Sequence, residues 1–143
     1  MKFRPGLALI AFALAALTGC GGSGSPVPVT GTITVKKKPE ANLLIQFCST
    51  AATGGKTFTG SATSAEEGKF EIVGADGKPG LSPGDYFVTV VDRNSEVEDE
   101  DLAKGKRIPP SRVDKKYMAP DEKVNPLKVK VEAGKTTYDL ILD

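Results

Sequence analysis

The stretch that decides the fold is VPVTGTITV, residues 27–35. Its apolar residues Val29, Ile33 and Val35 alternate with polar ones, and this period of two is typical of a β-strand with one buried face. The lysines that follow lead to Pro39, which has no N–H for a strand ladder, so the strand is expected to end there.

The same alternation recurs along the rest of the chain. It predicts further strands at residues 43–48, 56–64, 69–73, 86–91, 127–131 and 138–142. Residues 56–64 are small and rich in threonine, which indicates a weaker edge strand, and the last two strands are expected to form a hairpin through Gly134. Seven short strands separated by turn signals predict an all-β, seven-stranded Greek-key sandwich of the transthyretin or immunoglobulin type.

The approach to Tyr86, with the sequence LSPGDY, resembles a tyrosine corner. In that motif the tyrosine hydroxyl bonds to the backbone a few residues upstream. A plain core tyrosine is the alternative interpretation.

The N-terminus has the pattern of an export signal. Lys2 and Arg4 precede an apolar run at residues 7–17, which is too short to span a bilayer as a helix. The tetrapeptide Leu17-Thr18-Gly19-Cys20 resembles a bacterial lipobox, which implies that residues 1–19 are a cleaved lipoprotein signal peptide and that Cys20 is acylated. Residues 20–26 then form a flexible tether, because glycine and serine dominate them, and residues 27–143 form the domain. An ordinary secretory signal and an uncut membrane anchor are the alternatives.

Composition excludes several classes of function. The chain has 19 basic and 18 acidic residues, and removal of the leader with its two basic residues leaves a net charge of −1, which does not favour nucleic acid. The chain has no histidine, which removes the commonest general base and the usual zinc ligand, so we expect no enzyme. Cys48 is expected to be a packed residue, with a reactive thiol or an intermolecular disulfide as alternatives.

The segment from Arg93 to Asn125 lacks the period of the strands. The sequence Ser95-Glu96-Val97-Glu98 fits a capping box, and we predict a helix over residues 96–104 with Val97 and Leu102 facing the sheet. The remainder, with three prolines, is predicted to be extended. Five carboxylates crowd into six positions, namely Glu96, Glu98, Asp99, Glu100 and Asp101. A solvated acidic face is the favoured interpretation of this run, and a calcium site is the weaker one.

Several short pieces resemble a known family of the bacterial envelope. They are VTGTI at residues 29–33, Lys38-Pro39, IQF at residues 45–47, GKF at residues 68–70, PGDY at residues 83–86, Lys116-Tyr117 and Asn125-Pro126-Leu127. Together they resemble small lipoproteins with a carboxypeptidase-regulatory-like domain. The resemblance implies a transthyretin-like sandwich over nearly the whole mature chain, and such domains carry no catalytic residues of their own.

The function expected from the sequence is a lipid-anchored, non-catalytic envelope module that binds another protein through a strand edge or through residues 93–125. It would need no cofactor and would contact the membrane through Cys20, most naturally at the outer membrane because Gly21 follows the cysteine. A glycan- or calcium-binding surface domain and a structural coat component are the alternatives.

Overall fold

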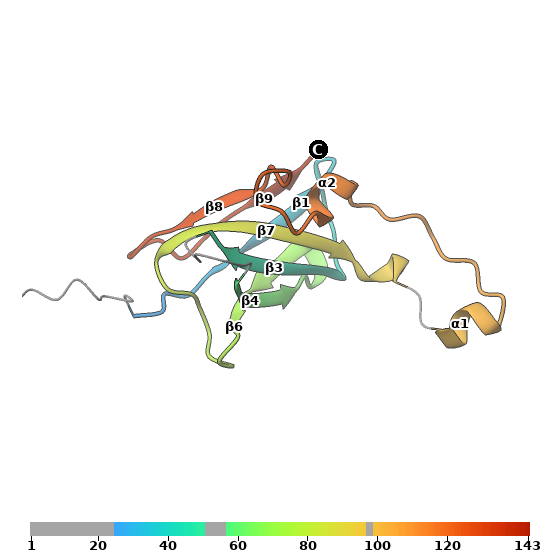
Figure 1. Cartoon of the computed structure of the whole chain (residues 1–143), viewed down its shortest axis with the longest axis horizontal. Helices are drawn as coiled ribbons and strands as arrows, with labels where there is room; N and C mark the ends of the chain where they lie inside the picture. Colours follow the sequence, from blue (N-terminus) through green and yellow to red (C-terminus); the bar gives the residue numbers. More distant parts are fainter. Residues whose placement is uncertain (1–24, 51–56, 97–98) are drawn as a thin grey trace, which may run out of the picture.

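The computed structural model describes residues 25–50, 57–96 and 99–143, and their regular secondary structure is mainly β-strands in two sheets (Figure 1). The strands are β1 Thr30–Val35, β2 Lys38–Pro39, β3 Leu43–Ser49, β4 Thr57–Thr63, β5 Lys69–Glu71, β6 Val73–Gly74, β7 Gly84–Asp92, β8 Lys128–Val131 and β9 Leu140–Leu142. The helical segments are the 3-10 turns η1 Glu66–Gly68 and η2 Arg93–Ser95 and the short helices α1 Asp99–Ala103 and α2 Lys115–Met118. The prediction of an all-β fold is confirmed, whereas the predicted leader and acylated Cys20 lie outside the described residues.

Strand β1 is the centre of the smaller sheet. It pairs with β2 and β5 in antiparallel fashion and with β9 in parallel, with Ile33 opposite Leu140. The larger sheet has the order β6-β4-β3-β7-β8, and all of its pairs are antiparallel. Each of the seven regions predicted as strands contains one, and the two-residue strands β2 and β6 are additional.

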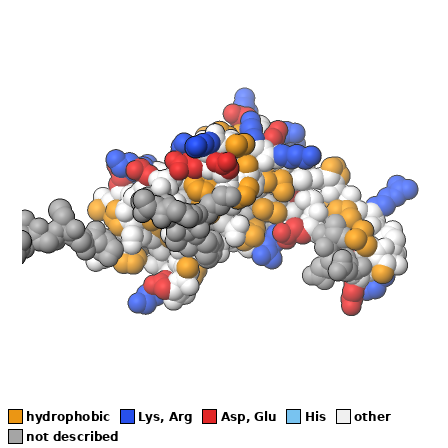
Figure 2. Space-filling model, viewed as in Figure 1, with side chains coloured by type: hydrophobic (Ala, Val, Ile, Leu, Met, Phe, Trp, Pro, Cys, Tyr) orange, Lys and Arg blue, Asp and Glu red, His pale blue; other side chains and the backbone are white. Residues whose placement is uncertain are grey.

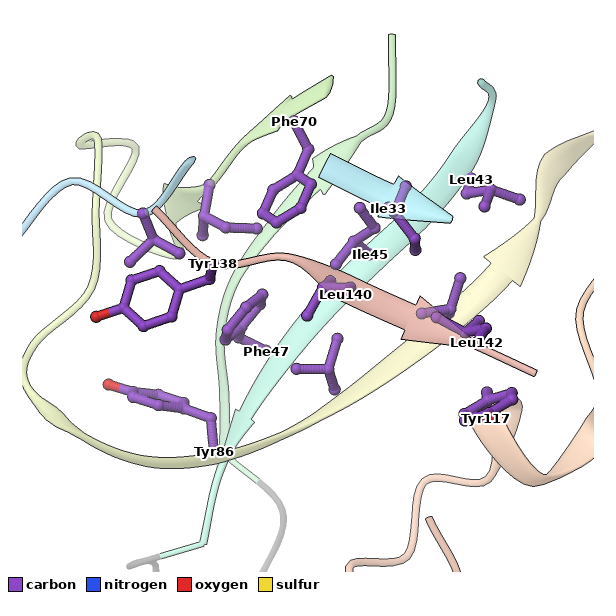
Figure 3. Close-up of a cluster of buried hydrophobic side chains, with 14 of the residues drawn as sticks. Ile33, Leu43, Ile45, Phe47, Phe70, Tyr86, Tyr117, Tyr138, Leu140 and Leu142 are labelled. Atoms are coloured by element: carbon purple, nitrogen blue, oxygen red, sulfur yellow. The ribbon is translucent and has the colours of Figure 1, made fainter. Parts of the chain in front are cut away.

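The core lies between the two sheets and draws on both of them (Figure 3). Leu43, Ile45 and Phe47 of β3 are fully buried, in the phase that the alternation predicted. The smaller sheet contributes Ile33, Val35, Leu140 and Leu142, and the larger also contributes Tyr86, Val88, Val90 and Val131. The Phe47 and Tyr86 rings meet edge to face with their centroids 5.9 Å apart. Cys48 is buried as predicted, opposite Phe87 of β7.

The predicted C-terminal hairpin is wrong. The turn itself forms, since the Lys135 N–H donates to the Glu132 carbonyl at 3.2 Å and Gly134 has a φ of 84°. Strands β8 and β9 nevertheless belong to different sheets, because β8 pairs with β7 while β9 pairs with β1. The intervening residues cross from one sheet to the other, so the C-terminal strand closes the smaller sheet.

The crossing depends on a close approach at Gly31. A Cβ atom at this position would lie 1.8 Å from the Tyr138 carbonyl oxygen, so only glycine fits beside the segment that leads into β9. The Tyr138 N–H donates to the Thr30 carbonyl at 2.8 Å and holds this approach in place.

The predicted tyrosine corner is confirmed in its defining contact. The Tyr86 hydroxyl donates to the Ser82 carbonyl at 2.6 Å, and the residue is 5% exposed. Burial raises the pKa of this phenol above its ordinary value. The hydroxyl therefore stays protonated and ties the turn before β7 to the start of that strand.

Candidate interaction surface

The most prominent feature outside the sheets is the segment of residues 93–111, which we call the arm. Figure 1 shows α1 and the chain that returns from it standing away from both sheets. The predicted helix over residues 96–104 is shorter in the structure, where α1 covers Asp99–Ala103. Leu102 is 58% exposed, so the prediction that it faces the sheet is wrong, and Val97 lies outside the described residues.

The serine of the predicted capping box takes part in the preceding 3-10 turn, and its expected partner Glu98 lies outside the described residues. Ser95 ends the 3-10 turn η2, and its hydroxyl donates to the Asp92 carbonyl at 2.8 Å. The Asp92 carboxylate caps that turn by accepting from the Asn94 N–H at 3.1 Å. The chain therefore leaves β7 through a capped 3-10 turn, which fixes the start of the arm.

Two ion pairs lie within the described part of the arm. Glu100 and Lys104 are 3.3 Å apart, and Asp101 and Lys106 are also 3.3 Å apart. Figure 2 shows hydrophobic, acidic and basic side chains together on this part of the molecule. Leu102 and Ile108, which is 37% exposed, supply apolar surface next to these charges.

The structure does not bring the calcium candidates together where it describes them. Glu96 is exposed, while Glu100 and Asp101 face lysines within the arm. Glu98 and the side chain of Asp99 lie outside the description. Across residues 25–50, 57–96 and 99–143, no group of three or more potential metal-binding side chains is found.

Arg112, which follows the arm, binds Asp92, which precedes it. Its Nε and Nη2 donate to the two oxygens of Asp92 at 2.8 and 2.7 Å, and its backbone N–H donates to the same carboxylate at 2.9 Å. Nη1 donates to Glu40, and Nη2 also donates to the Ala41 carbonyl at 3.0 Å. A planar guanidinium suits this arrangement because it binds one carboxylate in a bidentate fork and still has donors left. We call Glu40, Asp92 and Arg112 the clasp.

Asp92 and Arg112 keep their charges at neutral pH. Hydrogen bonds from Arg112 hold the pKa of Asp92 below its ordinary value, although burial acts in the opposite direction. The same bonds, with those to Glu40, raise the pKa of Arg112. Asp92 therefore stays deprotonated and Arg112 stays protonated. The two side chains do not exchange a proton, and their ion pair has a structural role.

Beyond the clasp the chain returns to the core through α2. Asp114 caps this helix by accepting from the Lys116 N–H at 3.0 Å, and Tyr117 is 5% exposed. The prediction that this stretch is extended is therefore wrong at α2. The Tyr117 hydroxyl accepts from the Asp143 N–H at 3.2 Å, which links the helix to the chain end.

Asn125 completes the return. Its side-chain nitrogen lies 2.9, 3.2 and 3.1 Å from the carbonyl oxygens of Val88, Tyr117 and Ala119. Its carbonyl oxygen accepts from the Leu127 N–H at 2.9 Å, so the amide is satisfied although it is 1% exposed. Asn125 therefore ties α2 to β7 just before β8 begins.

Sequence reasoning missed the clasp and the amide of Asn125. A signal for the clasp was present, because Asp92 has the same phase as the inward residues Tyr86, Val88 and Val90. A carboxylate in the inward phase of a buried strand needs a cationic or N–H partner. No local sequence pattern pointed to Arg112 as that partner, because it lies 20 residues further along the chain.

Comparison with protein-family models, with curated proteins and with solved structures found no match for the chain. None of the helices among the described residues has the length and apolar character needed to cross a bilayer.

Proposed function

We propose that the chain is a lipid-anchored, non-catalytic module of the bacterial cell envelope that binds another protein through the arm. The observation that carries the proposal is the clasp. It joins Asp92, just before the arm, to Arg112, just after it, so a long excursion projects from a fixed base. Binding residues are commonly placed on loops that a rigid scaffold positions.

The composition of the arm supports a protein partner. Leu102 and Ile108 are exposed large apolar residues, and the same segment carries ion-paired acids and lysines. An apolar centre with a rim of mixed charge is the usual arrangement of a protein interface. Charges of both signs also allow electrostatic selection of the partner.

Site-specific cross-linking in cells tests this proposal. A photo-crosslinking amino acid in place of Leu102 should capture one protein reproducibly, as identified by mass spectrometry. The same amino acid in place of Lys78, an exposed turn residue outside the arm, is the matched control and should not capture that protein. Equal capture from both positions, or no capture from position 102, would contradict binding through the arm.

Membrane attachment is a separate part of the proposal and has its own test. Export and acylation rest on the N-terminal apolar run and on Cys20. A cell fed an alkyne-labelled fatty acid should incorporate the label into the wild-type chain and not into Cys20→Ala. Fractionation of the labelled cells should place the wild type in the outer membrane.

We propose further that the two sheets form the transthyretin-like Greek-key sandwich. The seven longer strands divide into the orders β4-β3-β7-β8 and β5-β1-β9, and the chain changes sheet between β1 and β3, β4 and β5, β5 and β7, and β8 and β9. The tyrosine corner before β7 supports the same assignment. A fold of this kind carries no activity by itself, so the function rests on the arm.

A further inference from the structure

The larger sheet ends in a strand with one open edge. Strand β8 pairs with β7, and within the described part of the chain no strand pairs with its other side. The Val88 N–H donates to the Leu127 carbonyl at 2.9 Å, and in an antiparallel pair the residues that face the partner alternate. Leu127, Val129 and Val131 therefore direct their backbone groups to β7, and Lys128 and Lys130 direct theirs outward.

A groove of about 590 Å³ runs beside this edge. Its walls come from β8 and from the segment that crosses to β9, with Lys128, Val129, Lys130, Glu132, Lys135, Thr137, Tyr138 and Asp139 as lining residues. The ring of Tyr138 is held in place, because its hydroxyl donates to the Lys135 carbonyl and accepts from the Glu132 N–H, both at 3.0 Å. Val129 and Tyr138 thus give the groove a small apolar floor.

The side chains at this edge alternate in chemistry. Lys128 and Lys130 are exposed on the outer face, whereas Val131 is buried and Val129 is half-buried on the inner face. The Lys135 ammonium lies 4.8 Å from the centre of the Tyr138 ring, on the groove. The edge therefore presents three cations around an apolar strip.

The nearby carboxylates leave these lysines accessible. Glu122 is 4.0 Å from Lys128, and Glu132 is 3.9 Å from Lys130, both at the limit of an ion pair between exposed groups. Asp139 accepts from the Thr32 hydroxyl at 2.7 Å and from its N–H at 3.3 Å, so its charge is turned to β1. An incoming carboxylate competes only with weak pairs.

We propose that the open edge of β8 binds an extended segment of another protein in which acidic residues alternate with apolar ones. The segment adds a strand to the sheet through the outward backbone groups of Lys128 and Lys130. Its carboxylates lie against the lysines on the outer face, and its apolar side chains enter the groove at Val129 and Tyr138. This surface is distinct from the arm, so the inference does not depend on the function proposed for the arm.

A second copy of the chain is a poorer occupant of the same edge. Pairing of two β8 strands in a register that keeps the valines inward would set lysines opposite lysines, and like charges on facing strands destabilise a sheet. Lysines on an edge strand commonly act against such self-pairing. The same residues that repel a second copy select an acidic strand.

Amide hydrogen exchange of the full chain in detergent micelles tests the inference. The probe is a synthetic peptide in which valine and glutamate alternate over six residues, and the matched control peptide has lysine in place of glutamate. Saturation with the acidic peptide should slow exchange of the Lys128 and Lys130 amides at least tenfold, because both amides become hydrogen-bonded. Equal protection by the two peptides, or none at these amides, would overturn the proposal.

Two variants separate strand addition from simple charge attraction. Lys130→Pro removes one outward N–H without touching the ladder to β7, so the fold should persist while protection by the acidic peptide is lost. The double substitution Lys128→Glu/Lys130→Glu should weaken the acidic peptide at least tenfold and should bind the lysine peptide instead. Lys78→Glu carries the same type of charge change at an exposed turn and should leave acidic-peptide binding unchanged. Dimerisation of the wild type that Lys130→Pro abolishes would identify a second copy as the occupant and would also overturn the proposal.

Discussion

At the scale of single residues, the clasp is the contact on which the arm most depends. Asp92 has a side-chain exposure of 1%, and its four hydrogen-bond donors come from Arg112 and Asn94. A buried carboxylate without its cation is strongly destabilising, because its desolvation is no longer compensated. Loss of the Arg112 guanidinium alone should therefore destabilise the fold strongly.

We predict that Arg112→Met lowers the free energy of unfolding by about 3 kcal/mol, since the stem is retained while Asp92 loses its partner. Urea denaturation at pH 7 measures this change. Lys104→Met removes one exposed ion pair of the arm and is the matched control, with an expected effect of no more than about 0.5 kcal/mol. Similar effects of the two substitutions would contradict the role given to the clasp.

The clasp also predicts a dependence of stability on pH. The pKa of Asp92 is lowered in the folded state, so its contribution is present above the unfolded pKa of about 3.9 and is lost as the pH falls through the folded value. Wild-type stability should therefore decline in acid below about pH 4. Arg112→Met should show a smaller decline, because its Asp92 no longer prefers the charged form, and denaturation curves between pH 2 and pH 7 compare the two proteins. A decline of equal size in both would show that other carboxylates dominate.

Asn125 gives a second prediction at this scale. Asn125→Asp places a carboxylate against the carbonyl oxygens of Val88, Tyr117 and Ala119, so we expect a loss of about 3 kcal/mol at pH 7. The loss should shrink in acid, because the protonated carboxyl can again donate a hydrogen bond. Asn94→Asp, at an exposed position, is the control and should change stability little. A loss that does not depend on pH would contradict this account.

At the scale of elements, the alternation of apolar and polar residues predicted where the strands lie but not which strands pair with one another. The alternation of apolar and polar residues indicates which face of a strand is buried, and β1 and β3 follow it, whereas in β7 Phe87 and Thr89 of the opposite face are buried as well. It does not state which strand lies alongside, so β8 and β9 were expected to pair across a turn that does form. Helix α1 was mispredicted for a related reason, since local charge patterns indicated a cap while Ser95 was used by the preceding 3-10 turn.

The turn between β1 and β2 carries a prediction of its own. Lys36 and Lys37 link the paired residues Val35 and Lys38 with φ angles of 50° and 65°, which is the geometry of a type I′ turn. Residues with a Cβ atom adopt this region at a cost of roughly 1 kcal/mol each, whereas asparagine and glycine favour it.

We therefore expect the double substitution Lys36→Asn/Lys37→Gly to raise the free energy of unfolding by about 1 kcal/mol. Thermal unfolding followed by circular dichroism measures the gain. Lys115→Asn/Lys116→Gly removes the same charges from α2 and should destabilise the protein, because glycine is a poor helix former. Stabilisation by both changes would mean that relief of positive charge, and not turn geometry, is the cause.

At the scale of the whole molecule, the arm and the C-terminal strand have opposite relations to the core. The arm projects from the sheets with Leu102 and Ile108 exposed, while the last strand buries Leu140 and Leu142 and closes the smaller sheet beside β1. Replacement of residues 96–107 by a short glycine-serine link should shift the melting temperature by no more than about 4 °C, because the side chains described in this range are almost all exposed. Truncation of residues 140–143 removes a smaller piece yet should abolish cooperative unfolding, since each buried leucine contributes about 2 kcal/mol and β1 loses its parallel partner. Differential scanning calorimetry of the two proteins distinguishes them, and only the excised one should still show a single sharp transition. The reverse result would make the arm part of the folding core and would remove the ground for treating it as a surface that is free to bind a partner.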